Sequence, residues 1–214
     1  MRGLLMKDFY LMAGQKRFFI IVFAIAALFI ITGQNETFIV GYVTMLCGIF
    51  AVTTIHYDEF NKGNIFLFTL PFQRKQYALE KYLFGIVAGG TAWIVSFAVV
   101  MIFRYGREKI DVREWGVSML TYLLVLLLML AVMIPIELKF GAEKGKLATF
   151  VLFFVVFGIF FFATNIFEEA GIDVSAMAEE MNLAKLALGA VVVTLLILAV
   201  SVSASIKIME KKQF

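Results

Sequence analysis

Long apolar runs separated by short charged segments dominate this chain. The six runs cover residues 18–32, 37–55, 83–103, 117–136, 147–167 and 184–206. None alternates between polar and apolar residues, as the strands of a membrane barrel do, so each run is expected to be a helix. All but the first approach the length of about 20 residues that crosses a hydrocarbon core of roughly 30 Å. The pattern predicts an all-α membrane protein with six transmembrane helices in a single domain, residues 1–214.

Composition supports the same class. Hydrophobic residues make up 62% of the 214, with 24 Phe and only two Pro, and the mean hydropathy is +0.94. A water-soluble domain rarely reaches these values, whereas a chain that uses lipid as its solvent does. We therefore expect a multi-pass protein of the cell membrane.

The orientation follows from the distribution of positive charge. With both termini in the cytoplasm, fourteen of the nineteen Lys and Arg residues lie on the inner side. The inverted arrangement would place those fourteen outside, against the rule that cytoplasmic loops are enriched in cations. The five exceptions are Arg104, Arg107, Lys109, Arg113 and Lys185.

The residues before the first run have an amphipathic pattern. Leu4, Leu5, Phe9 and Met12 recur at helical spacing, with charged residues between them. This pattern suits a helix that lies in the inner membrane interface, and a frayed tail is the alternative. We see no cleavage site after the first run, so that run is expected to stay in the protein as an anchor.

Several kinds of chemistry are missing from the sequence. The segment from Gly141 to Leu147 superficially resembles a phosphate-binding loop, but its spacing is short and Leu147 replaces the required hydroxyl. His56 is the only histidine and Cys47 the only cysteine, so a His pair for zinc and an intrachain disulfide are excluded. We predict no catalytic residue, no metal site, no cofactor in this chain and no nucleic-acid partner.

The most specialised segment is the charged insert between the second and third runs, Thr54 to Tyr82. Asp58 and Lys62 are four residues apart in the favourable order, and an apolar stripe accompanies them, which predicts a short helix. Pro71 ends it and can start another helix. Arg74, Lys75, Tyr77, Lys81 and Tyr82 would then suit the lipid headgroup layer. We interpret the insert as a docking surface.

Several motifs occur together around this insert. They are Tyr57-Asp58-Glu59-x-Asn61-Lys62, Thr69-Leu70-Pro71-x-x-Arg74-Lys75-x-Tyr77, the opening Leu4-Leu5-x-Lys7-Asp8, and Pro135-x-x-x-Lys139-Phe140-Gly141. With them the chain resembles the six-span permease subunits of type-2 ABC exporters, in the branch that includes bacterial exporters of peptide toxins and antimicrobial peptides.

The resemblance implies how the protein works. A coupling helix within Tyr57 to Leu70 would contact a dimer of a separate cytosolic ATPase, which binds ATP and Mg, and residues 4–12 would form an interfacial elbow helix. The expected contacts are Tyr57, Asp58, Glu59, Phe60, Asn61 and Lys62, with a second, smaller contact at Lys139, Phe140 and Gly141. A second permease, identical or related, would complete the transporter in the bacterial plasma membrane.

Evidence about cargo is confined to aromatic residues of the fifth run. Phe153, Phe157, Phe160 and Phe161 are candidates for an apolar path taken by an amphipathic peptide, and simple contact with membrane lipid is the alternative. Gly85-x-x-x-Gly89 in the third run is a packing motif, within the chain or between two permeases.

Other classes of protein stay open at this level. They are a membrane immunity or sensor protein without transport, a channel or ion-coupled carrier, and an exporter of lipid, drug or ion. Few ionisable residues fall deep in any run, which disfavours an ion-coupled carrier.

Overall fold

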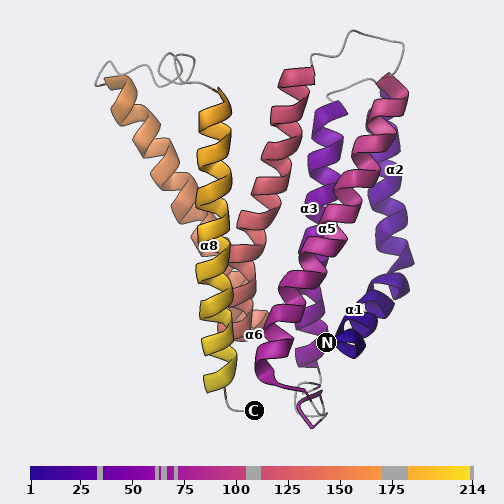
Figure 1. Ribbon diagram of the computed structural model, residues 1–214, viewed down its shortest axis with the longest axis vertical. Coiled ribbons are helices and arrows are strands. Elements are labelled where there is room, and N and C mark those ends of the chain that lie inside the picture. The colour runs from indigo at the N-terminus through magenta and orange to yellow at the C-terminus, as the bar shows by residue number, and fades with distance from the viewer. Residues whose placement is uncertain are drawn as a thin grey trace.

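The computed structural model describes residues 1–32, 36–60, 63, 67–69, 72–104, 112–169 and 183–212. These residues form helices and no strand, arranged as a bundle with two splayed helices at one flank (Figure 1). The helices are α1 (Arg2–Gly14), α2 (Lys16–Thr32), α3 (Glu36–Glu59), α5 (Arg74–Arg104), α6 (Val112–Glu169) and α8 (Leu183–Lys211).

Four helical segments are long and apolar enough to cross a membrane. They are Thr37–Glu59, Arg74–Phe103, Trp115–Gly158 and Lys185–Lys211. The bent pair α1 and α2, whose axes differ by 65°, brings the number to five if it is taken as one span. The all-helical, multi-pass class predicted from the sequence is confirmed.

Helix α6 is divided by Gly141, which has φ 78° and ψ 178°. This conformation is open almost only to glycine. Figure 1 shows α6 running to one end of the bundle and turning back there. The predicted fourth run thus falls on the first half of α6, and the predicted fifth run falls on the second half. One non-helical residue, Gly141, replaces the longer connection that was expected between the two runs.

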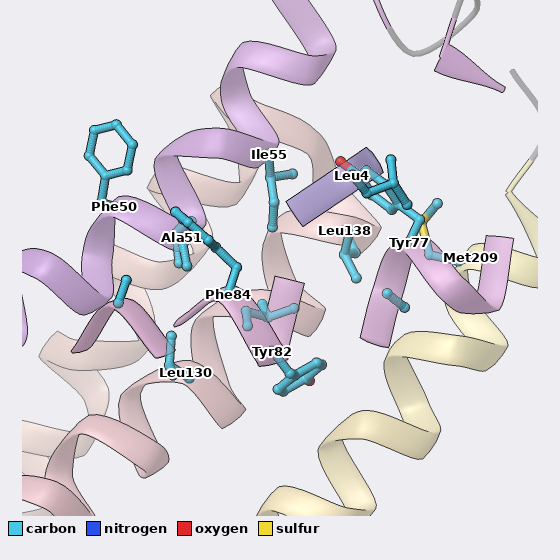
Figure 2. Close-up of a cluster of buried hydrophobic side chains, with 14 of the residues drawn as sticks. Leu4, Phe50, Ala51, Ile55, Tyr77, Tyr82, Phe84, Leu130, Leu138 and Met209 are labelled. Carbon is cyan, nitrogen blue, oxygen red and sulfur yellow. The ribbon is translucent and has the colours of Figure 1, made fainter. Parts of the chain in front are cut away.

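The core is built around α3, which packs against α2, α5 and α6. Figure 2 shows its main cluster, in which Ile55 of α3, Phe84 of α5 and Leu130 of α6 are buried together. A Cβ on Gly85 would lie 2.8 Å from Leu130 Cδ2, and one on Gly89 would lie 2.6 Å from Leu126 Cδ2. The Gly85-x-x-x-Gly89 motif therefore serves packing of α5 against α6 within the chain.

The second half of α6 and α8 carry a large exposed apolar surface. Figure 1 shows these helices diverging from the rest of the bundle at the end away from the termini. Phe157 on α6 and Val200 on α8 are 69% and 70% exposed. In a membrane protein such a surface contacts lipid or another membrane subunit.

The opposite end of the bundle gathers the features that the sequence assigned to one side of the membrane. The N-terminus, the C-terminal end of α8, the turn in α6 and the connection from α3 to α5 all lie there (Figure 1). We call it the terminal end. Helix α5 starts at Arg74, so the interfacial helix and the span predicted after Pro71 form one continuous helix.

Candidate functional site

Buried charged residues from three helices meet at the terminal end, where α1 packs against α3 and α5. At the centre is Lys81 of α5, whose side chain is 0% exposed. Its ammonium nitrogen lies 2.6 Å from Asp8 Oδ2 on α1 and 2.8 Å from Asp58 Oδ2 on α3. It also donates to the hydroxyl of Thr54 at 3.0 Å. Lys81 therefore joins all three helices.

A second lysine completes the cluster from the side of α1. Lys7 donates to Asp58 Oδ1 and lies 3.1 Å from Asp8 Oδ1. The hydroxyl of Tyr77 donates to Asp58 Oδ2 at 2.9 Å. We call Lys7, Asp8, Thr54, Asp58, Tyr77 and Lys81 the three-helix clamp.

Two lysines face two aspartates in this clamp, and the buried carboxyl of Glu80 lies beside them, with its Oε2 3.6 Å from Lys81 Nζ. Burial alone would raise the pKa of Asp8, but Lys81 and Lys7 outweigh burial and hold that pKa below its ordinary value. Removing one member of such a buried set leaves its partner charged and unpaired, which costs far more than losing a surface ion pair. The clamp therefore fixes the position of α1 against α3 and α5.

The clamp corrects one expectation from the sequence. Tyr77, Lys81 and Tyr82 were expected to face the lipid headgroups, yet all three are buried. Tyr82 instead contacts the hydroxyls of Ser201 and Ser205 on α8, at 2.6 and 2.8 Å. These residues lie on the face of α5 that packs against α3 and α8, a property that residue type alone does not reveal.

A separate set of contacts joins the end of α3 to the turn in α6. Glu59 Oε2 accepts a hydrogen bond of 2.6 Å from the backbone N–H of Ala142, the first residue after Gly141. Its other oxygen accepts one from Lys212 Nζ at 3.0 Å, and this amine also donates to the carbonyl of Leu138. A carboxylate at the start of a helix satisfies free N–H groups and opposes the positive end of the helix dipole. Glu59 thus caps the second half of α6.

His56 and Glu137 form the neighbouring contact between the same two helices. His56 Nε2 lies 3.0 Å from Glu137 Oε2, and the Glu137 side chain is 1% exposed. A Cβ on Gly145 would come within 2.1 Å of the same carboxylate oxygen, so glycine lets the second half of α6 pass close to Glu137. His56 lies in the last turn of α3.

The residues predicted to contact an ATPase divide into two groups. Tyr57 and Phe60 face outward, 41% and 72% exposed, and the Tyr57 hydroxyl accepts a hydrogen bond from Gln15 at 2.6 Å. Asp58 and Glu59 point inward, to the clamp and to α6. Asn61 and Lys62, together with residues 64–66 and 70 of the segment predicted to hold the coupling helix, lie outside the described residues.

The predicted second contact lies at the turn in α6. Lys139 and Phe140 are exposed, with Lys139 Nζ 5.1 Å from the centre of the Phe140 ring, and Gly141 forms the break itself. Glu59 therefore connects the second predicted contact region with the first.

The candidate path residues face outward. Phe153, Phe157 and Phe161 are all more than half exposed, and the side chain of Phe160 lies outside the described part of the chain. They line no enclosed path in this single chain. Among the described residues, no group of three or more His, Cys, Asp and Glu is placed to hold a metal ion.

Comparison with known proteins adds the family. The model of the ABC-2 family transporter proteins matches residues 3–210. The chain belongs to the ABC-2 transporter family. It is therefore a permease of the ABC-2 type, a family of transport subunits. Searches of curated proteins and of solved structures found no match.

Sequence reasoning singled out Asp58 and Glu59 in this permease but missed the partners that hold them. Lys7 and Asp8 stood in one of the motifs, whereas Lys81 was assigned to the membrane surface. The one usable signal was Lys81 itself, a cation within two residues of the third apolar run. A lysine so close to a span is costly unless it is paired or reaches the surface.

Proposed function

We propose that this permease is the membrane subunit of an ATP-driven exporter, and that a separate cytosolic ATPase dimer moves it by pressing on the connection between α3 and α5. The terminal end is the cytoplasmic end in this proposal. ATP and Mg are bound by the ATPase, and a second permease, identical or related, completes the transporter.

The proposed transporter subunit has six spans. Helix α6 would extend about 87 Å if it were straight, nearly three times the hydrocarbon thickness. Counting its two halves separately, together with α2, α3, α5 and α8, gives six spans with both termini on one side. Helix α1 is then the elbow helix, bent 65° away from α2 and lying in the inner interface.

The observation that carries the proposal is the three-helix clamp directly behind the connection. A push on a loose loop would be absorbed by the loop. Here the last turn of α3, the first turns of α5 and the elbow helix share buried ion pairs, so displacement of the connection has to move all three together. Rigid movement of packed helices is how a small displacement becomes a change of access.

Glu59 extends this rigid unit to the other half of the molecule. It joins the end of α3 to the second half of α6 and, through Lys212, to the end of α8. The exposed flank formed by those two helices would then move with the connection. For cargo to move, the ATPase must favour one arrangement of the permease in its ATP-bound state.

The proposed cargo is amphipathic, most simply a peptide. This part rests on the resemblance to peptide exporters and on the exposed aromatic face of α6, which includes Phe153 and Phe157. If the second permease packs near this flank, the same face could line the cargo route. An amphipathic peptide that stimulates ATP hydrolysis by the reconstituted complex would support this choice of cargo, and stimulation by lipids or drugs alone would contradict it.

Partner recognition is tested with two matched variants of α3. Phe60→Ala removes an exposed ring directly after the end of α3, and Phe38→Ala removes a half-exposed ring near the start of that helix. The tagged permease is purified from its own cells. A co-purified ATPase is identified by its phosphate-binding sequence, and its amount is measured by its hydrolytic activity.

The proposal predicts a bound ATPase with the unaltered chain and with Phe38→Ala, and a loss of several-fold or more with Phe60→Ala. Equal recovery of the ATPase from all three preparations, or no ATPase in any of them, would contradict it.

A further inference from the structure

An open groove runs along the outer face of the bundle between α2 and α5. Its volume is about 740 Å³, within the range of small-molecule sites. Val43 and Cys47 of α3 form its floor, and Phe9, Met12 and Ala13 of α1 close it at the terminal end. Neither the contact of α6 nor that of α8 with the bundle uses this face.

The lining of the groove is apolar, and the protons of its hydroxyl groups are already used in hydrogen bonds. Its only hydroxyl groups are those of Thr91 and Ser96, and each donates to backbone carbonyls of its own helix. Both hydroxyl protons are thus used within α5, and the other described lining residues are apolar apart from the Cys47 thiol. Such a lining suits the hydrocarbon part of a ligand.

The length of the groove matches one membrane leaflet. On α2 its lining extends from Phe19 to Ile31, about 18 Å along the helix axis. Half of the hydrocarbon core is about 15 Å. Phe23, Ile31, Val95 and Phe103 on its rims are exposed, so the groove is open along its side to the surrounding membrane.

Two positive charges stand at the terminal end of the groove. Lys16 and Arg17 follow the bend between α1 and α2, in sequence between the groove residues Ala13 and Phe19. Both are exposed, and neither forms an ion pair or side-chain hydrogen bond with another described residue. The 65° bend between α1 and α2 lies at Gln15, directly before these two residues.

We infer that this groove binds an anionic phospholipid, with an acyl chain lying between α2 and α5 and the phosphate held by Lys16 and Arg17. Charge complementarity selects this occupant over the alternatives. A cationic peptide would be repelled by the two side chains, and an apolar helix of a second permease would leave both charges without a partner. A lipid held here fixes the angle between α1 and α2, and so supports the elbow from the membrane side.

Two pairs of variants test separately the contact with the lipid phosphate and the contact with the acyl chain. Lys16→Gln with Arg17→Gln removes the charge, and Lys144→Gln with Lys146→Gln is its control, because those exposed lysines lie on α6, away from the groove. Ala27→Trp fills the groove. Ala98→Trp is the control, since Ala98 is exposed on α5 but does not line the groove.

The measurement is native mass spectrometry of lipid-depleted protein in detergent, titrated with phosphatidylglycerol or with phosphatidylcholine of the same chains. Melting temperature without lipid checks that each variant is folded. We expect preferential phosphatidylglycerol adducts, binding at least about fivefold weaker after loss of both charges, a loss of similar size with Ala27→Trp, and no change in either control.

Three results would overturn the inference. One is equal binding of the two lipids by the unaltered chain. Another is displacement of the bound lipid by glycerol 3-phosphate, which would show a site for the free anion alone. The third is an effect of Ala27→Trp on the monomer–dimer ratio without an effect on lipid, which would assign the groove to a second copy.

Discussion

Glu59 on α3 caps the helix that starts at Ala142, and this contact sets the position of the turn in α6. The carboxylate accepts the backbone N–H at 2.6 Å while Gly141 adopts a conformation reserved for glycine. The end of α3 and the α6 turn are therefore built as one unit.

Gly141→Ala is expected to lower the free energy of unfolding by about 2 kcal/mol or more. The side chain adds strain of about 1–3 kcal/mol at this backbone conformation, and its Cβ would lie 2.8 Å from Glu59 Oε2. Denaturant unfolding in detergent, followed by tryptophan fluorescence, measures the change. Gly189→Ala on α8 is the control, because nothing lies within 4 Å of the added Cβ. Equal stability of the two variants would contradict the role given to Gly141.

Lys81→Met should be among the most destabilising substitutions in the protein. It leaves Asp8 and Asp58 buried with only Lys7 opposite them, at a cost of about 3–5 kcal/mol. Lys75→Met, at an exposed lysine of the same helix, should change the free energy of unfolding by less than about 0.5 kcal/mol.

The double variant Asp8→Asn with Lys81→Met tests whether the loss comes from charge. It removes one carboxylate together with its lysine, and leaves Lys7 to pair with Asp58. We expect it to be more stable than Lys81→Met alone in the same unfolding assay. A double variant less stable than both single variants would show that packing, and not charge balance, dominates the clamp.

The clamp also predicts resistance to acid. Because the pKa of Asp8 is lower in the folded protein than in the unfolded chain, its ion pairs add stability above the unfolded value of about 4 and lose it as the pH falls further. Protease cleavage within α1 should therefore stay slow from pH 7 to about 4, and increase below that. Asp8→Asn should be cleaved faster at pH 7 and show a smaller acid dependence. Fast protease cleavage within α1 of the unaltered chain at pH 5 to 6 would contradict the lowered pKa of Asp8.

Much of this fold is predictable from the chain alone, because lipid imposes a simple pattern. Residues 37–55 and 184–206 are predominantly apolar, and each range lies within an observed helix. The helix ends were harder to place. Nothing between Arg74 and Leu83 breaks a helix, so α5 begins nine residues before the predicted span.

The site was predictable only in part, since its essential contacts join residues far apart in sequence. The sequence suggested Lys62 as a partner of Asp58, and Lys62 lies outside the described residues. The contacts of Asp58 that the structure describes come from Lys7, Tyr77 and Lys81 on two other helices. In the sequence, Gly141 was only one residue of a motif. Its role became apparent only with the backbone angles and with Glu59 in place.

The most direct test of the account is a crosslink from the connection itself. Cys47 is the only cysteine and is buried, so Cys47→Ala gives a background without thiols. Phe60→Cys and, as the control, Phe38→Cys are then labelled with a photoreactive thiol reagent in the assembled transporter. The account predicts a covalent product with the ATPase subunit from position 60 and none from position 38. A product from position 38 alone, or a transporter that moves its cargo at full rate with no ATPase bound, would contradict it.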